Sequence, residues 1–369
     1  MSGPRRIVIL GLTLSSSWGN GHATTYRGLV RELCALGHEV LFLERDVPWY
    51  REHRDLSQPP YGRLAFYEGL DALRDTHAQD IADADLVIVG SYVPEGIDVG
   101  RWVLGHARGI TAFYDIDTPV TLARVAEGAC AYLDRELVPR YDLYLSFTGG
   151  PTLQRLEQDY GSPCARPLYC AVDPALHAPQ PCVPRWDLGY LGTYASDRQP
   201  ALERLLLNAA RHWPAGRIVV AGPSYPGTVH WPSNVQRIEH LPPAAHAEFY
   251  AGQRYTLNLT RADMRRAGYS PSVRLFEAAA CATPVISDRW PGLDSFFSPG
   301  REVLTAASAV EVLDHLRRIP EERRLAIGRA ARARVLAEHT AACRARTLIG
   351  YLESMFRTGT AAVAMEVDR

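Results

Sequence analysis

One predicted helix near residue 273 combines a serine-rich entry loop with a basic and an acidic side chain. Tyr269, Ser270 and Ser272 precede the helix, and Arg274 and Glu277 follow within it. The free N–H groups at the start of a helix attract phosphate, and a carboxylate accepts hydrogen bonds from ribose hydroxyls. The i,i+3 spacing places Arg274 and Glu277 on the same helical face. This combination indicates a site for a nucleotide that carries phosphates.

The residues after Glu277 also fit a purely structural role. Small residues occupy positions 278–282, and Thr283 and Pro284 lead into an apolar run at 285–287. A helix of small residues that packs on a strand is common in α/β cores, so this part of the pattern leaves a structural explanation open.

A second candidate phosphate loop follows the predicted strand at residues 187–191. Gly192 permits close approach of the backbone, Tyr194 comes next, and Arg198 supplies a guanidinium suited to phosphate. An arginine at the start of a helix can also simply be solvated. Arg261, just after the strand at 255–259, is a further candidate, but Arg274 is favoured because it shares a helical face with Glu277.

A histidine opens the first long helix, immediately after a loop of small and polar residues. The loop comprises Ser16, Ser17, Trp18, Gly19, Asn20 and Gly21, and His22 follows it. Gly19 and Gly21 permit backbone conformations that other residues disfavour, and a histidine at such an edge can act as a general base. Capping or a structural role for His22 is the alternative. The spacing does not match G-x-G-x-x-G, so a dinucleotide fingerprint is not indicated.

Two aspartates end a predicted strand at residues 111–114. Asp115 and Asp117 point to the same side because side chains alternate along a strand, and a carboxylate there is costly unless it has a partner. One of them could orient His22 and stabilise its charge. A D-x-D metal site and capping of the next helix are the alternatives. We favour the role beside His22, because the second half of the chain offers a site that needs no metal.

Short apolar runs alternate with helices along the whole chain. Strands are expected at residues 6–12, 39–43, 85–89, 111–114, 143–147, 187–191, 217–221, 255–259 and 284–287, and helices at 22–36, 200–210, 246–251, 272–282, 309–318, 321–338 and 341–355. This alternation is typical of parallel sheets covered by helices on both faces. Prolines interrupt residues 174–186, which therefore form a predicted linker. The tail after residue 358 is expected to be frayed.

Composition limits the classes of protein to consider. The 369 residues suffice for about two domains. With 40 basic and 41 acidic residues, the net charge of −1 does not favour nucleic acid or an anionic membrane as a partner. No apolar segment approaches the roughly 20 residues of a membrane span, so we expect a cytoplasmic protein. Seven cysteines without a C-x-x-C pair do not indicate a zinc site or a disulfide framework.

Several longer phrases resemble one family. WGNGHATTYR, FYDIDTPVT, YLSFTGG, DLGYLGTY and SVRLFEAAACATPVISDRWPGLDSFF look like the CgeB-like (spore-maturation-type) group of GT-B glycosyltransferases, and the Val-Asp-Pro run at 172–174 resembles the hinge of that fold. The resemblance implies two Rossmann-like doubly wound domains that face a cleft. They would comprise residues 1–173 with 341–369, and residues 187–340, with 174–186 as linker. The last helix would cross back to the first domain.

The resemblance also implies a function. It implies a hexosyltransferase-type enzyme that moves a sugar from a nucleotide-diphosphate sugar, UDP-linked, to the hydroxyl of a small-molecule, glycan or polypeptide acceptor, without a metal or another cofactor. A nucleotide-sugar epimerase of the same fold and a non-catalytic nucleotide-sugar-binding or coat-associated protein are alternatives. Many retaining GT-B enzymes carry a second Glu eight positions before the one that corresponds to Glu277, but Tyr269 stands there in this chain. The stereochemical outcome therefore stays open.

Overall fold

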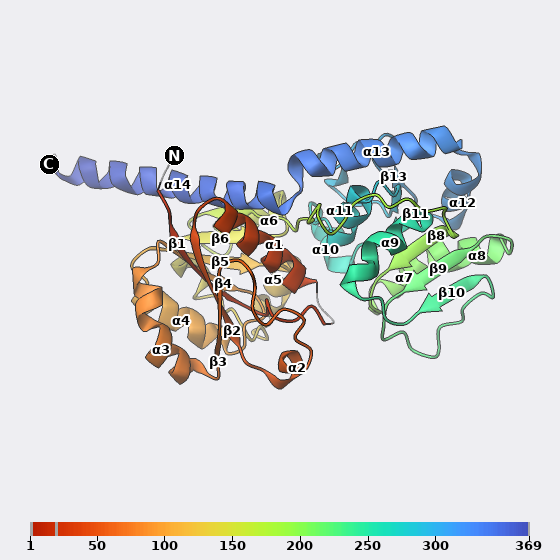
Figure 1. The fold of residues 1–369 in the computed structure, drawn as a ribbon. Coiled ribbons are helices and arrows are strands. Elements are labelled where there is room, and N and C mark those ends of the chain that lie inside the picture. The colour runs from red at the N-terminus through yellow and green to blue at the C-terminus, as the bar shows by residue number, and fades with distance from the viewer. Residues whose placement is uncertain (1–2, 19–20, 368–369) are drawn as a thin grey trace. The chain divides into compact units, whose positions relative to one another are not determined.

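The chain folds into two compact α/β units in a computed structural model (Figure 1). The structure describes residues 3–18 and 21–367, with side chains up to residue 357, so Gly19 and Asn20 of the predicted loop lie outside the described residues. The N-terminal unit comprises Met1–Tyr169 and Ala341–Arg369, and the C-terminal unit comprises Cys170–Thr340. Residues 174–186, the predicted linker, belong to the C-terminal unit.

A seven-stranded parallel sheet forms the centre of the N-terminal unit, in the order β3-β2-β1-β4-β5-β6-β7. Its strands are β1 (Arg6–Gly11), β2 (Glu39–Arg45), β3 (Arg63–Tyr67), β4 (Leu86–Gly90), β5 (Ile110–Asp115), β6 (Leu143–Ser146) and β7 (Ala165–Pro167). Its helices are α1 (His22–Ala35), α2 (Pro48–Arg51), α3 (Leu70–Asp83), α4 (Gly96–His106), α5 (Thr118–Ala126), the 3-10 turn η1 (Val138–Arg140), α6 (Pro151–Gln158) and α14 (Ala341–Val367).

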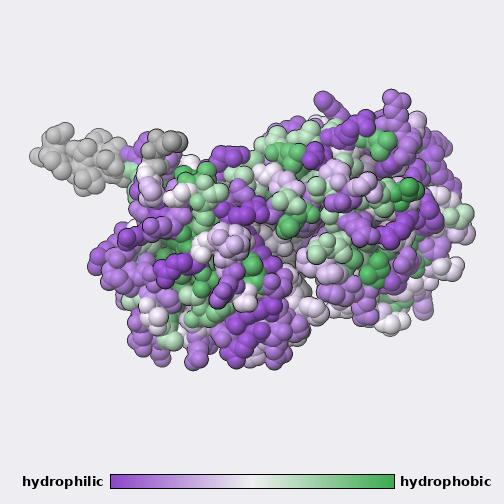
Figure 2. Space-filling model, viewed as in Figure 1, coloured by the Kyte–Doolittle hydropathy of each residue, from purple (hydrophilic) through white to green (hydrophobic). Residues whose placement is uncertain are grey.

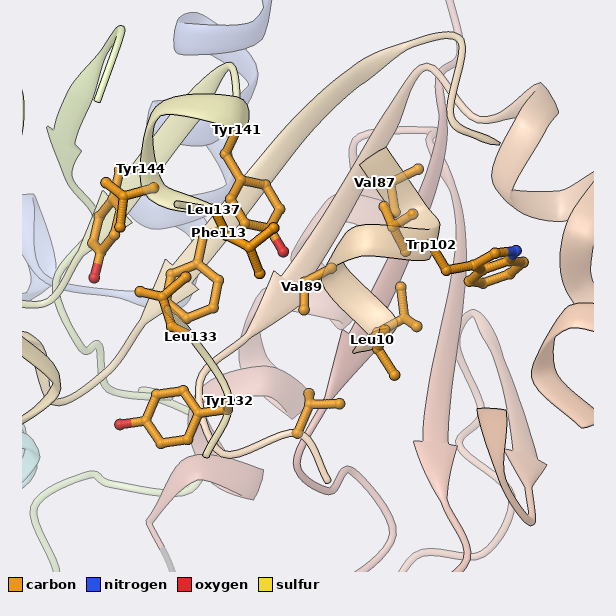
Figure 3. Close-up of a cluster of buried hydrophobic side chains, with 14 of the residues drawn as sticks. Leu10, Val87, Val89, Trp102, Phe113, Tyr132, Leu133, Leu137, Tyr141 and Tyr144 are labelled. Carbon is orange, nitrogen blue, oxygen red and sulfur yellow. The ribbon is translucent and has the colours of Figure 1, made fainter. Parts of the chain in front are cut away.

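Each face of this sheet carries its own hydrophobic core, because consecutive strand residues point to opposite sides. Leu10, Val89 and Phe113 lie on one side, where Trp102 of α4 and Tyr141 join them (Figure 3). Side chains of β1, α1 and α14 form the core on the other side, including Ile9, Leu29, Val30, Leu348 and Leu352. Fully burying a side chain of this size stabilises the fold by about 1.5–3 kcal/mol.

The last helix, α14, returns to the N-terminal unit, as the predicted fold requires. Arg344 Nε donates to the carbonyl of Tyr169 at 2.9 Å, and the Tyr351 hydroxyl donates to the carbonyl of Pro167 at 3.0 Å. The prediction that the chain frays after residue 358 is wrong, because α14 continues to Val367. The alanine-rich composition of residues 361–364 favours helix, which the absence of an apolar periodicity concealed.

A six-stranded parallel sheet, β10-β9-β8-β11-β12-β13, forms the C-terminal unit. Its strands are β8 (Trp186–Leu191), β9 (Ile218–Ala221), β10 (Val235–Ile238), β11 (Gln253–Asn258), β12 (Val285–Ser287) and β13 (Leu304–Thr305). Its helices are α7 (Gln199–Leu202), the π-helical η2 (Glu203–Leu207), α8 (Asn208–His212), η3 (Pro243–Ala245), α9 (His246–Ala251), α10 (Ala262–Ala267), α11 (Val273–Ala280), η4 (Leu293–Ser295), α12 (Ala309–Arg318) and α13 (Glu321–Glu338).

Both sheets reverse their strand order beside their first strand. In the N-terminal unit, β1 has β2 on one side and β4 on the other, and in the C-terminal unit β8 lies between β9 and β11. Ligands of doubly wound sheets bind at such switch points, beyond the carboxyl ends of the strands. Each unit therefore has one preferred place for a ligand.

Hydrophilic residues cover most of the face that Figure 2 shows, and hydrophobic residues lie among them in small groups. Within the described residues, every helix is either too short or too polar to cross a membrane.

The packing of α14 against the N-terminal unit can be tested by truncating Leu348, which is fully buried. We expect Leu348→Ala to lower the free energy of unfolding by about 2–5 kcal/mol, because the substitution removes buried methyl groups and leaves a cavity. Leu36→Ala removes an exposed side chain of the same unit and should change the stability by less than about 0.5 kcal/mol. Urea unfolding followed by circular dichroism measures both, and equal stabilities would contradict this packing.

Candidate functional site

The entry loop of α11 is fixed to the carboxyl ends of two strands. Ser272 precedes the helix with an extended backbone, and its hydroxyl donates to Asn258 Oδ1 at 2.7 Å instead of capping the helix. Asn258 ends β11, and its side-chain amide donates to Ser287 Oγ at 3.0 Å, at the end of β12. The start of α11 therefore lies at the carboxyl edge of the sheet, with its N-terminal N–H groups at that edge.

Arg274 lies at the switch point between β8 and β11. Its Nε donates to the carbonyl of Leu191, its Nη1 donates to Asn258 Oδ1 at 3.3 Å, and its guanidinium carbon lies 4.9 Å from the centre of the Tyr190 ring. A Cβ atom at Gly192 would come within 2.9 Å of Arg274 Nη2. Gly192 therefore leaves room for the guanidinium, and the structure brings these two predicted residues together.

Glu277 lies one turn after Arg274 and is buried, with only 6% of its surface exposed. The Tyr250 hydroxyl donates to Glu277 Oε2 at 3.0 Å. His177 Nε2 lies 3.6 Å from Oε1, and His246 Nδ1 lies 3.9 Å from Oε2. Burial lowers the pKa of His246, and the negative charge of Glu277 opposes that shift. The carboxylate therefore has a hydroxyl and two imidazoles around it.

Two separate segments bring these partners to Glu277. His246 and Tyr250 are four residues apart on α9 and therefore share a face, and Thr283 Oγ1 fixes the end of that helix by donating to the Tyr250 carbonyl at 2.9 Å. His177 ends a tight turn in which its own N–H donates to the carbonyl of Asp173 at 2.9 Å.

The sequence did not predict these three partners of Glu277. The i,i+4 spacing of His246 and Tyr250 could have indicated that both side chains lie on the same face of α9. His177, in contrast, lies in the predicted linker, about 100 residues before Glu277, and its role depends on a contact that no local pattern encodes.

The turn after α11 lies close to α13 because Gly328 of α13 has no side chain. A Cβ atom at Gly328 would come within 2.1 Å of the Ala282 carbonyl oxygen, so a side chain there would push this turn away from α13. Phe276, on the other face of α11, stacks on His339 with ring centres 4.5 Å apart. This packing holds the orientation of α11, and with it the direction of Arg274 and Glu277.

The remaining predicted residues of the C-terminal unit lie in the surrounding loops. Arg198 begins α7, its Nη2 donates to the Thr193 carbonyl at 2.8 Å, and its buried Nε has no hydrogen-bond partner among the described residues. Burial raises the pKa of Tyr225, and the charges of Arg198 and Arg274 both oppose that rise. Arg198 and Arg274 therefore both lie near enough to Tyr225 for their charges to act on it, together with Arg237.

Four further predicted residues of this unit are Tyr194, Arg261, Tyr269 and Ser270, and the first three of them contact neighbouring loop residues. The Tyr194 ring packs edge-on against Tyr225 at 5.6 Å, and Arg261 Nε lies 3.5 Å from Asp197. Tyr269 has a positive φ of 49°, and its N–H donates to the Pro291 carbonyl at 2.7 Å. Ser270 is buried. These residues shape the loops around α11, and Tyr269 does so through its backbone.

In the N-terminal unit, a buried carboxylate holds the loop after β1. Glu44 is fully buried and accepts hydrogen bonds from the Thr13 hydroxyl (3.0 Å), the Leu14 N–H (2.7 Å), and both the N–H (2.9 Å) and the hydroxyl (2.6 Å) of Ser15. No local sequence pattern points to Glu44, because it lies near the end of a neighbouring strand about 30 residues away.

The next three loop residues contact a second segment. Ser16 Oγ donates to the His53 carbonyl at 2.8 Å, and the Trp18 ring stacks on the His53 ring at 4.6 Å. The Ser17 N–H and hydroxyl donate to Asp55 at 3.0 and 2.6 Å. Burial by itself raises the pKa of Asp55, but the hydrogen bonds from Arg27 and Ser17 outweigh it and lower the pKa to about 2. This segment therefore fixes the loop that leads to His22.

His22 is the first residue of α1; the residue as a whole is half-buried, but its ring atom Nδ1 is inaccessible to solvent. Its ring lies 5.6 Å from that of Tyr92, and the Tyr92 hydroxyl donates to Asp117 Oδ2 at 2.9 Å. Burial lowers the pKa of His22 to about 4, although the charge of Asp117 opposes the shift. Because Tyr92 lies two residues after the end of β4, these residues lie at the switch point of the first sheet.

The two predicted aspartates differ in their surroundings. Asp115 is fully buried and accepts hydrogen bonds from the Tyr144 hydroxyl (2.6 Å), the Thr121 hydroxyl (2.8 Å) and the Asp117 N–H (3.2 Å). Burial raises its pKa to about 6. Asp115 therefore fixes the turn between β5 and α5, whereas Asp117 is the aspartate whose charge acts on His22.

Comparison with known proteins finds a family match in the second part of the chain. Residues 198–350 match the model of a family described as "Glycosyl transferase-like", which covers less than half of the chain. No curated protein sequence matches the chain significantly.

Solved structures match almost the entire chain at low sequence identity. Sucrose-phosphate synthase from Thermosynechococcus elongatus is 15% identical, covers 96% of this chain and 100% of its own, and has a TM-score of 0.69. Anabaena HepE in complex with UDP-glucose is 13% identical, with 94% and 99% coverage and a TM-score of 0.69. An alpha-glucosyltransferase in complex with UDP and a 13-mer DNA is also 13% identical, with 95% and 100% coverage and a TM-score of 0.69. The predicted GT-B fold is thereby confirmed.

The environment of His22 predicts its titration. We expect the imidazole to stay neutral on acidification until the pH approaches 4, because burial disfavours the imidazolium. An unfolded chain protonates a histidine near pH 6.5, so His22 should reduce the stability of the fold progressively as the pH falls from 6.5 to 4. NMR titration of the His22 ring protons in wild type, assigned with a His22→Gln variant, measures the midpoint. A midpoint near 6.5 would contradict the buried environment.

Proposed function

We propose that this protein is a hexosyltransferase-type glycosyltransferase of the CgeB-like group, which moves a sugar from a UDP-linked donor to an acceptor hydroxyl. The observation that carries the proposal is the position of Arg274 and Glu277, one turn apart on α11, with Arg274 at the switch point between β8 and β11. The family match spans these residues, and two of the structurally similar proteins were solved with UDP or UDP-glucose bound.

The C-terminal unit offers complementary groups for each part of the donor. A diphosphate needs positive charge and N–H donors, which Arg274, Arg198 and the start of α11 supply. Ribose hydroxyls need an acceptor, which the Glu277 carboxylate supplies one turn further along the helix. The arginines would neutralise the charge of the nucleoside diphosphate as it leaves. We expect this arrangement to work without a metal ion.

The N-terminal unit offers a base for the acceptor. At neutral pH His22 is uncharged and can accept a proton. As the acceptor hydroxyl loses its proton to His22, its oxygen bonds to the anomeric carbon and the nucleoside diphosphate leaves with the bonding electron pair. The negative charge of Asp117, whose carboxylate the Tyr92 hydroxyl holds, would stabilise the resulting imidazolium. The acceptor would be a small molecule, a glycan or a polypeptide.

Donor binding is tested by removing the Glu277 carboxylate. We expect Glu277→Ala to weaken UDP binding by about 1.5–3 kcal/mol, because the ribose loses a hydrogen bond to a charged acceptor. Glu322→Ala, which removes an exposed carboxylate of the same unit, should leave the affinity unchanged. Isothermal titration calorimetry measures both variants, and circular dichroism verifies that they are folded. An unchanged UDP affinity in folded Glu277→Ala would remove Glu277 from the donor site.

The chemical step is tested at His22. We expect His22→Ala to lower kcat by about 10²–10⁴, the usual contribution of a positioned base, while the donor affinity stays constant. Asp117→Asn should lower kcat as well, but the double variant should lose little more, since members of one catalytic unit fail together. Single-turnover rates with an identified acceptor, combined with the anomeric configuration of the product by NMR, test whether His22 is the base. Retention of configuration with a near-normal rate in His22→Ala would exclude His22 as the catalytic base.

A further inference from the structure

We propose that His177, His246 and Glu277 form a binding site for a divalent transition metal ion of the zinc type, and that the bound ion antagonises the nucleotide. The metal site is inferred from geometry alone, whereas the antagonism rests on the proposed role of Glu277 in donor binding. All three residues belong to the C-terminal unit, so the site is complete within it.

The three side chains converge on one point. One ligand atom from each of them lies within 4.8 Å of the other two. His177 Nε2 lies 3.6 Å from Glu277 Oε1, and His246 Nδ1 lies 3.9 Å from Oε2. Zinc bonds to imidazole nitrogen and carboxylate oxygen at about 2.0–2.2 Å, which places tetrahedral ligands somewhat more than 3 Å apart. Small side-chain rotations therefore bring the three atoms to coordination distance.

The burial of His177 indicates that a partner belongs there. His177 is only 4% exposed, and neither ring nitrogen has a hydrogen-bond partner among the described residues. Leaving a buried polar group unpaired costs about 1–3 kcal/mol. Because Nε2 is the ring nitrogen 3.6 Å from Glu277, an ion between the two side chains would accept its lone pair and remove part of this cost.

Neighbouring residues form hydrogen bonds to the other two ligands, Glu277 and His246, as is usual for metal ligands. The Tyr250 hydroxyl donates to Glu277 Oε2 at 3.0 Å, and His246 is hydrogen-bonded to the backbone of Leu241. Such outer contacts fix the orientation of ligating carboxylates and imidazoles. Two nitrogens and one oxygen favour zinc, cobalt or nickel over magnesium and calcium, which prefer oxygen ligands. Three protein ligands leave a fourth position for water.

A metal ion at this place would compete for the carboxylate that the donor needs. An ion that is bound to Glu277 neutralises the carboxylate and occupies its lone pairs, so ribose hydroxyls lose their acceptor. Binding equilibria are reciprocal, so the nucleotide must weaken metal binding by the same factor by which the metal weakens nucleotide binding. The site would therefore reduce donor affinity when the concentration of the free ion rises.

The metal site is tested with Co²⁺ as a spectroscopic probe. The protein would be treated with EDTA, freed of chelator and titrated with Co²⁺, in a Cys182→Ser background that removes the exposed thiol. We expect one equivalent to bind with the visible absorption of four-coordinate cobalt. His177→Gln and His246→Gln should each weaken binding at least about tenfold, since even the loss of an outer contact costs 10–100-fold. His230→Gln, which changes an exposed histidine of the same unit, should bind normally.

A second titration separates the metal site from the antagonism. UDP affinity would be measured by calorimetry with and without saturating Co²⁺, in the Cys182→Ser protein and in its His246→Gln variant, which controls for binding of the ion to free UDP. We expect Co²⁺ to weaken UDP binding only where His246 is present. Cobalt binding that is equal in all three histidine variants overturns the metal site. UDP affinity that Co²⁺ leaves unchanged overturns the antagonism, and a protein that binds Co²⁺ but not UDP refutes the proposed donor site alone.

Discussion

The burial of one carboxylate, that of Glu277, constrains the organisation of the C-terminal unit. A buried charge is costly unless hydrogen-bond donors and opposite charges surround it. The Tyr250 hydroxyl on α9 donates a hydrogen bond to Glu277, and the rings of His246 and His177 lie 3.9 and 3.6 Å from its carboxylate oxygens, so three segments distant in sequence meet around this group. Arg274, one turn away, is held by β8 and β11. The same contacts that stabilise the carboxylate therefore also define the polar site.

The buried and half-buried carboxylates of the N-terminal unit differ in the number of hydrogen bonds that they accept. Glu44 receives four hydrogen bonds from the loop after β1, and Asp115 receives three at the end of β5. Both are fully buried and rigidify the carboxyl edge of the sheet. Asp117 lies at the rim of this frame and acts electrostatically on His22. Rigid surroundings would keep the His22 ring in one orientation, as its proposed role as a base requires.

The sequence predicts the fold well where strands are apolar throughout, as in β1 and β4, because both faces of a parallel sheet are buried. It does not predict β3, β7, β10 or β13, which are short or carry polar residues and lie at or near the sheet edges. Arg274 and Glu277 are recognisable because their spacing is local. His177 and Glu44 are not, because their roles arise from contacts between residues about 30 to 100 positions apart.

A crystal structure with bound UDP tests the central claim of this account most directly. The claim is that a nucleoside diphosphate binds at the start of α11, where the strand order of the second sheet reverses. The structure should show a ribose hydroxyl within hydrogen-bond distance of the Glu277 carboxylate and the diphosphate against Arg274 and the N–H groups of α11. UDP bound elsewhere, with Glu277 still enclosed only by His177, His246 and Tyr250, would contradict it.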